Sequence, residues 1–214
     1  MSRKLLITVM ICTAVLGTAL AAAREYNVQH ESINNEETAE SLLLLSLFYQ
    51  DQGRYAAAKD VLYEYLQHNP GQGWVWVLIG DLDYLLGDYD LALKSYVKAL
   101  MVGDYARSYY GIGLINSQQG ITADVIGAFK KAVEIAPSFV EARIALAKVY
   151  LHTEQYEEAR TQLETAYLYA PRDAKIHYYL WKVYTIESDQ SKARHHGELA
   201  VQYDPGYAEL IDPK

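Results

Sequence analysis

The side chains of this chain that could do chemistry are few and do not combine into a site. His195, His196 and Glu198 have the donor atoms of a metal centre, and His195 and Glu198 lie three residues apart on one face of a predicted helix. Adjacent histidines, however, point about 100° apart around a helix, and no second cluster supplies the remaining ligands of a tetrahedral centre. We interpret this stretch as a solvated helix face and predict no metal.

Asp81 and Asp83 have the residue type of an acid/base pair, but two positions apart on a helix they do not share a face. The sequence contains no Gly-x-Ser-x-Gly, His-Glu-x-x-His or P-loop motif. Gly111 and Gly113 lie within a predicted helix, where they favour close packing rather than phosphate binding. We therefore predict no enzymatic activity, no catalytic residue and no cofactor.

The elements that hold these residues recur along the chain. The stretch GDYDLALKSYVKAL (87–100) has counterparts at 53–66, 120–133, 154–167 and 188–201, and their starts lie 34, 33, 34 and 34 residues apart. Each has alanine or valine at its sixth place, and four of the five units end in proline. A segment with apolar residues at i, i+3, i+4 and i+7 precedes each stretch. Each unit is therefore predicted to be a helix, a turn and a second helix.

This pattern resembles the tetratricopeptide repeat (TPR), with repeats at 39–72, 73–105, 106–139, 140–173 and 174–207. The resemblance implies an all-α, right-handed superhelical solenoid of five helix-turn-helix units. Pentatricopeptide repeats have a similar length but usually bind RNA. An acidic chain with few clustered basic residues argues against them, so no nucleic-acid partner is expected.

The N-terminal residues 1–23 have the layout of a secretory signal. Arg3 and Lys4 precede an apolar run, and Ala21 and Ala23 fit a cleavage site. The alternative is an uncleaved anchor, because the run is about long enough to span a bilayer. Cleavage would remove Cys12, the only cysteine, and shift the formal net charge from −8 to about −10.

Residues 24–38 are predicted to be a polar spacer. We predict a periplasmic or secreted protein, with a membrane-anchored form facing the periplasm as the alternative. Membrane contact is expected only through an uncleaved N-terminal segment.

The C-terminal end departs from the repeat pattern. Trp181 stands where four other units have a small residue, and Gly197 stands where they have a large one. The segment 208–214 is a short tail, and the residues from Tyr207 onward are predicted to be too short for the extra helix that often covers such arrays. The second helix of the fifth repeat is therefore expected to cap the array and to be its least stable part.

The TPR resemblance implies a concave groove lined by the first helix of each unit. In this register the candidate partner-binding residues are Trp74, Val77, Asp81, Tyr84, Arg107, Tyr110, Leu114, Ile144, Lys148, Lys175, Tyr178 and Lys182. Aromatic and apolar residues occupy the centre, acids the N-terminal end and bases the C-terminal end. The alternative for the apolar members is simple packing between neighbouring helices. A lysine/asparagine clamp for chaperone C-termini is not expected, because Leu43, Leu47, Val77 and Asp81 occupy its places.

The sequence thus predicts a non-enzymatic adaptor or assembly factor of the bacterial cell envelope. Its partner would be another protein, bound through a peptide or helix in the groove with its acidic end toward the last two repeats. The alternative is a permanent structural subunit that forms a homo-oligomer or complex through its convex face or its C-terminal repeat.

Overall fold

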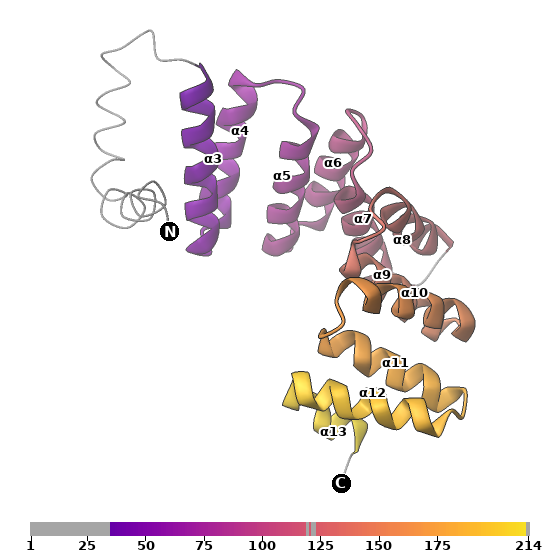
Figure 1. Cartoon of the computed structure of the whole chain (residues 1–214). Coiled ribbons are helices and arrows are strands. Elements are labelled where there is room, and N and C mark those ends of the chain that lie inside the picture. Colours follow the sequence, from indigo (N-terminus) through magenta and orange to yellow (C-terminus); the bar gives the residue numbers. More distant parts are fainter. Residues whose placement is uncertain (1–34, 119, 121–122, 213–214) are drawn as a thin grey trace. The chain divides into compact units, whose positions relative to one another are not determined.

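The computed structural model describes residues 35–118, 120 and 123–212, in which every regular element is a helix (Figure 1). The predicted signal, and the predicted spacer as far as residue 34, lie outside these residues. The all-α class is confirmed. In the part of the chain described, no helix is both long enough and apolar enough to cross a membrane.

The chain divides into two compact units, Met1–Asn69 and Pro70–Lys214. The described part of the first unit is a single hairpin of α3 (Asn35–Asp51) and α4 (Tyr55–His68). Leu62 and Tyr65 of α4 are buried. This hairpin is the first of the helix-turn-helix units.

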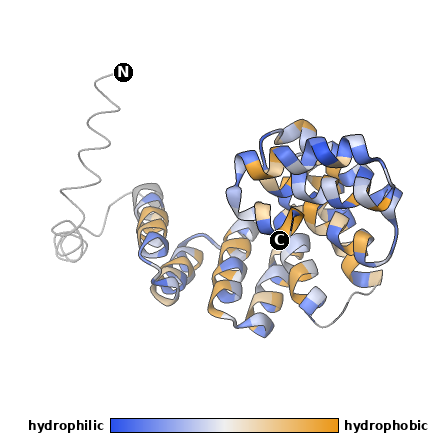
Figure 2. Ribbon diagram, turned by 90° about the horizontal axis from the view of Figure 1, so that it is seen from below, coloured by the Kyte–Doolittle hydropathy of each residue, from blue (hydrophilic) through white to orange (hydrophobic). Residues whose placement is uncertain are grey.

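The second unit contains four hairpins in succession, and it holds all twelve candidate site residues. They are α5 (Gly73–Leu86) with α6 (Tyr89–Leu100), α7 (Ala106–Gln118) with α8 (Ala123–Ile135), α9 (Val140–His152) with α10 (Tyr156–Tyr169), and α11 (Ala174–Ile186) with α12 (Gln190–Tyr203). The second helix of each hairpin packs on the first helix of the next, and α5 touches α7 as α9 touches α11. Hydrophobic and hydrophilic residues alternate along these helices (Figure 2), as two-sided packing requires.

The turn inside every hairpin uses a left-handed backbone at the same place of the repeat. Gly53, Gly87 and Gly120 have φ values of 69°, 82° and 129° there. In the last two hairpins the equivalent residues are Glu154 and Ser188, with φ values of 60° and 62°. Because a side chain makes this conformation less favourable by about 1 kcal/mol, the repeat geometry overrides the local preference of these two residues.

Glycines inside the first helices make room for the aromatic side chains of the second helices. A Cβ atom built on Gly80 would lie 2.6 Å from the Tyr96 ring, and one built on Gly111 would overlap the same ring. One built on Gly113 would lie 2.6 Å from the Phe129 ring. Tyr96 is therefore held between α5 and α7, and the packing role predicted for Gly111 and Gly113 is confirmed.

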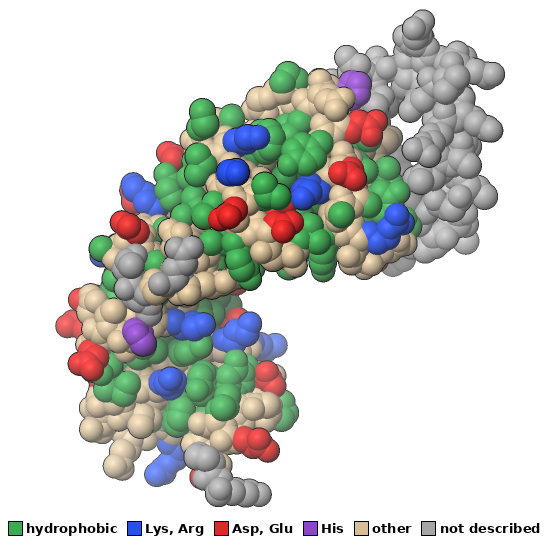
Figure 3. Space-filling model, turned by 180° about the vertical axis from the view of Figure 1, so that it is seen from behind, with side chains coloured by type: hydrophobic (Ala, Val, Ile, Leu, Met, Phe, Trp, Pro, Cys, Tyr) green, Lys and Arg blue, Asp and Glu red, His purple; other side chains and the backbone are tan. Residues whose placement is uncertain are grey.

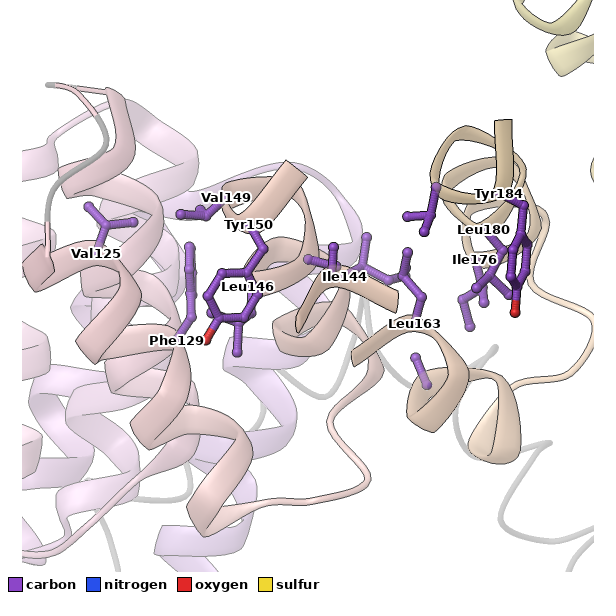
Figure 4. Close-up of a cluster of buried hydrophobic side chains, with 14 of the residues drawn as sticks. Val125, Phe129, Ile144, Leu146, Val149, Tyr150, Leu163, Ile176, Leu180 and Tyr184 are labelled. Carbon is purple, nitrogen blue, oxygen red and sulfur yellow. The ribbon is translucent and has the colours of Figure 1, made fainter. Parts of the chain in front are cut away.

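The main core of the second unit runs continuously from α8 to α11. Figure 4 shows Val125 and Phe129 of α8 beside side chains of α9, then Leu163 of α10, and then Ile176 and Leu180 of α11. Phe129, Leu163 and Ile176 are almost completely buried. Because neighbouring hairpins share this core, no hairpin of this unit forms a hydrophobic core by itself.

At the C-terminal end the last hairpin is filled by a large side chain and covered by a short element. Trp181 Cδ1 lies 3.2 Å from where a Cβ of Gly197 would be. In this hairpin the large residue therefore lies on the first helix and the small residue on the second, the reverse of the other hairpins. The segment expected to be too short for a helix forms η1 (Pro205–Tyr207) and α13 (Ala208–Ile211), and η1 packs against α12. That expectation was wrong because Tyr207 and Ile211 find apolar partners on the last hairpin, which stabilise a short element that could not persist alone.

Candidate functional site

The twelve predicted residues lie on the first helices of the four hairpins in the second unit, which we call the first-helix surface. Trp74, Val77, Asp81 and Tyr84 lie on α5; Arg107, Tyr110 and Leu114 on α7; Ile144 and Lys148 on α9; and Lys175, Tyr178 and Lys182 on α11. Val77 and Ile144 are each only 7% exposed and belong to the hydrophobic core. Val77 and Ile144 therefore pack between helices, which was the alternative to partner binding for the apolar candidates. The other ten residues are half-buried or exposed.

Asp81 is the centre of a bonded cluster at the α5–α7 end of this surface. The Tyr96 hydroxyl donates a hydrogen bond of 2.7 Å to Asp81 Oδ1, and Arg107 Nε lies 3.0 Å from Oδ2 and 3.2 Å from Oδ1. Burial raises the pKa of the Asp81 carboxyl, while the charge of Arg107 and the bond from Tyr96 oppose that rise. Asp81 and Arg107 thus neutralise each other. Neither residue therefore adds net charge to the predicted gradient from acids at the N-terminal end to bases at the C-terminal end.

Asp83 has a separate, buried environment. Its carboxylate accepts a hydrogen bond of 3.2 Å from Ser95 Oγ. Asp81 and Asp83 thus bond to different partners and, as expected from their spacing, do not form an acid/base pair.

The middle of the first-helix surface is aromatic and only partly accessible. The Tyr110 ring lies 5.9 Å from the Phe129 ring and 5.0 Å from the Phe139 ring, and Arg107 lies 5.8 Å from its centre. Burial raises the pKa of Tyr110 above its usual value. Tyr84 packs on Tyr89 of the next helix, with 5.4 Å between ring centres. These half-buried rings therefore support the helix packing and remain partly accessible.

The α9–α11 end of the surface carries basic side chains that have no acidic partner. Lys148, Lys175 and Lys182 form no ion pair within residues 35–118, 120 and 123–212. Lys182 lies 5.9 Å from the centre of the Tyr178 ring. Glu141, which is exposed, is two helical turns from Lys148 on α9. This end therefore keeps the basic character that the sequence predicts.

Tyr178 belongs to a larger ring cluster that the sequence did not reveal. Its ring stacks on Trp181 with 5.6 Å between centres, and Tyr207 of η1 lies 4.9 Å away. The contact repeats that of Tyr110 with Phe139, because Tyr207 follows Pro205 as Phe139 follows Pro137. That shared Pro-x-aromatic spacing is the signal by which the covering role of Tyr207 could have been found.

The histidine stretch differs in part from its prediction. His195 and Glu198 are exposed, as a solvated helix face requires. His196 is half-buried instead, and its Nδ1 lies 2.9 Å from Nδ1 of His177, which is fully buried on α11. The interpretation of His196 was wrong because its partner lies nineteen residues earlier, on a different helix. Among the residues described, no group of three or more His, Cys, Asp or Glu side chains could hold a metal ion.

The hairpin geometry agrees with known protein families. Models of the tetratricopeptide repeat match residues 39–71, 75–102 and 118–180, which together exceed half of the chain. The chain is a tetratricopeptide-repeat protein. TPR proteins generally act as non-enzymatic scaffolds that mediate protein–protein interaction.

Two curated relatives of this TPR protein match over part of their length. DnaJ homolog subfamily C member 7 of Homo sapiens is 30% identical over 120 residues, which are 54% of this chain and 24% of that protein. BBSome complex member BBS4 of Bos taurus is 27% identical over 169 residues, which are 78% of this chain and 33% of that protein. The chain thus spans between a quarter and a third of the length of these relatives.

Solved structures share the fold at lower identity. MamA from Desulfovibrio magneticus RS-1 has a TM-score of 0.63 and 20% identity, with 80% of this chain and 97% of that chain covered. YrrB has a TM-score of 0.59 and 16% identity, with 79% and 87% covered. At such identities the likeness concerns the fold of this TPR protein and not its partners.

Proposed function

We propose that this protein is a non-enzymatic adaptor or assembly factor whose first-helix surface binds a peptide or helix of a client protein. The observation that carries the proposal is the row of half-buried aromatic residues on α5, α7 and α11, followed by Lys148, Lys175 and Lys182, which form no ion pair with any residue that the structure describes. Aromatic side chains of this kind are enriched where proteins bind each other. YrrB, which shares the fold, is a TPR protein with an unusual peptide-binding site.

The charges favour one orientation and one class of ligand. Since Asp81 and Arg107 neutralise each other, the net charge contributed by the named residues is concentrated in the three lysines of α9 and α11. An acidic client segment would therefore place its carboxylates at the α9–α11 end and its apolar residues against Tyr110 and Leu114. One face of the molecule shows acidic and basic side chains scattered among hydrophobic ones, so opposite charges alternate there rather than form one block (Figure 3).

The cellular setting that we propose rests on the N-terminal sequence. The signal-like residues 1–23 support export across a bacterial inner membrane, with an uncleaved anchor facing the periplasm as the alternative. In that setting the client would be a component of an envelope assembly.

Site-specific photocrosslinking in the native host tests the proposal. A photoreactive residue at Lys175, exposed on α11, should form an adduct with the client, whereas one at Lys94, exposed on α6, should not. The double variant Lys148→Glu/Lys182→Glu should abolish the Lys175 adduct by placing like charge against the acidic segment. The matched control Lys94→Glu/Lys130→Glu makes the same change of charge on second helices and should retain it. An adduct from Lys94 that survives in the first variant would place the binding surface elsewhere.

A permanent structural subunit is the second candidate function. Leu168 on α10 and Leu210 on α13 are 77% and 56% exposed, which leaves apolar area available for a lasting interface. One relative, BBS4, is named as a member of a complex. A mass that rises with concentration in analytical ultracentrifugation, and that falls back on Leu168→Lys, would favour this reading over the adaptor.

A further inference from the structure

The buried histidine pair of the last hairpin joins three segments of the chain. His177 of α11 is 0% exposed, and its Nε2 lies 3.0 Å from the carbonyl oxygen of Pro171, in the turn between α10 and α11. Its Nδ1 lies 2.9 Å from Nδ1 of His196 on α12. The two rings therefore connect the α10–α11 turn to both helices of the last hairpin.

The protons of this network follow from the Pro171 carbonyl. A carbonyl oxygen only accepts, so His177 Nε2 carries a hydrogen and donates it. The Nδ1 atom of a neutral His177 then has a free electron pair and accepts from the N–H of His196 Nδ1. In this state, with both rings neutral, one hydrogen lies between the two Nδ1 atoms.

The surroundings of the pair are mostly aromatic. The Tyr184 ring stacks on His196 with 5.5 Å between centres, and Tyr167 of α10 meets both histidines edge-on. Tyr203 lies 5.4 Å from His177. These rings surround the pair with uncharged aromatic side chains.

The charged groups around the pair do not stabilise the positive charge that an added proton would bring. Glu164 of α10 faces His196 but accepts a hydrogen bond of 2.7 Å from the Tyr184 hydroxyl. Lys192 and His195 of α12 act against a positive His196. Burial, together with His177, lowers the pKa of His196 to about 4.

We propose that the His177–His196 pair is an acid-sensitive latch that holds α12 on α11, beside the α10–α11 turn, while both rings are neutral. One added proton creates a cation among tyrosine rings, and a second sets two N–H donors against each other at the present 2.9 Å. Protonation therefore favours separation of α12 from α11. Because α11 also carries Lys175, Tyr178 and Lys182, opening would disturb one end of the first-helix surface, and this last consequence rests on the proposed function.

The direction of the pH effect follows from the lowered pKa. An unfolded histidine binds its proton at a pKa near 6.5, above that of the folded His196, so acid favours the opened form. The contribution of the pair is complete above about pH 6.5 and is lost progressively as the pH falls toward about 4. Between pH 7 and pH 5 the equilibrium for opening should shift by about twentyfold.

Hydrogen exchange of the full chain at pH 7 and pH 5 tests the latch, with protection factors correcting for the intrinsic rate. In the wild type, amides of α11 and α12 should lose about twentyfold in protection, while those of α5 to α8 should change little. His196→Asn places an amide N–H near the position of Nδ1 but cannot titrate, so its protection should be nearly independent of pH. The control His195→Asn changes the exposed neighbour and should behave as the wild type. Equal losses in His196→Asn and the wild type would overturn the proposal.

A second measurement does not depend on any variant folding. In NMR spectra of the wild-type chain, the His196 ring should titrate clearly below the ordinary histidine pKa of about 6.5. Titration of His196 near pH 6.5 would overturn the latch. Neither experiment uses a client, so failure of the latch would leave the proposed binding function untouched.

Discussion

The two ends of the first-helix surface use the same repeat position in opposite ways. Asp81 on α5 is bonded to Tyr96 and Arg107, whereas Lys148 on α9 and Lys182 on α11 occupy the equivalent place without an acidic partner. The first end is therefore committed to holding helices together, and the second remains available to a ligand. Repeat position alone does not make a residue a binding residue, because the neighbours that the fold brings to it decide its role.

The largest expected effect tests how firmly the α5–α7 end is locked. Gly111→Ala puts a methyl group into the Tyr96 ring, and we expect it to lower the free energy of unfolding by about 3 kcal/mol. Urea unfolding followed by circular dichroism would measure this change. Gly127→Ala is the control, because nothing lies within 4 Å of its Cβ position on α8, and it should stabilise by up to about 1 kcal/mol. Similar values for the two variants would contradict the close contact of Tyr96 with α7.

The next effect compares the two charged ends directly. Asp81→Ala removes the acceptor of the buried Tyr96 hydroxyl and the partner of Arg107, and should destabilise by about 2 kcal/mol. Lys148→Ala removes an exposed side chain without an acidic partner and should change stability by less than about 0.5 kcal/mol. Thermal unfolding of both variants gives the difference. If Lys148→Ala were as damaging as Asp81→Ala, the α9–α11 end would also be structural.

The smallest effect concerns the hairpin turns, where early and late repeats differ. Glu154→Gly relieves a left-handed backbone and should stabilise by about 0.5 kcal/mol, after the extra entropy of glycine in the unfolded chain is counted. Glu157→Gly, within α10, lacks that relief and should destabilise by about 1 kcal/mol. Chemical denaturation resolves the opposite signs. A loss of stability in Glu154→Gly would show that the left-handed turn is not strained.

Tyr110 shows where the sequence reasoning needed the structure. Its repeat position makes it a candidate groove residue. In the fold its ring contacts Phe129 and Phe139, so its removal is also expected to destabilise the protein. Charge reversal at Lys148 and Lys182 is the cleaner test, since these side chains make no comparable packing contacts.

Most of the fold could be predicted because the same sequence pattern recurs in five units. Alanine or valine at one fixed place of each unit and apolar residues at helical spacing determine the helices and their pairing, since both depend on local periodicity. The packing role of Gly111 and Gly113 followed from the same pattern. Val77 and Ile144 could not be separated from the other apolar residues of the surface, because burial depends on which helices meet around them.

By itself, the sequence determined a stack of helical hairpins whose first helices carry aromatic and basic residues at regular places. The tertiary structure alone decided that Arg107 closes on Asp81, that Trp181 fills the space beside Gly197, that Tyr207 covers Tyr178, and that His196 meets His177. Each of these pairs joins side chains from different elements. Periodicity fixes which way a helix faces, but contacts between elements depend on how the helices pack together, which no local pattern encodes.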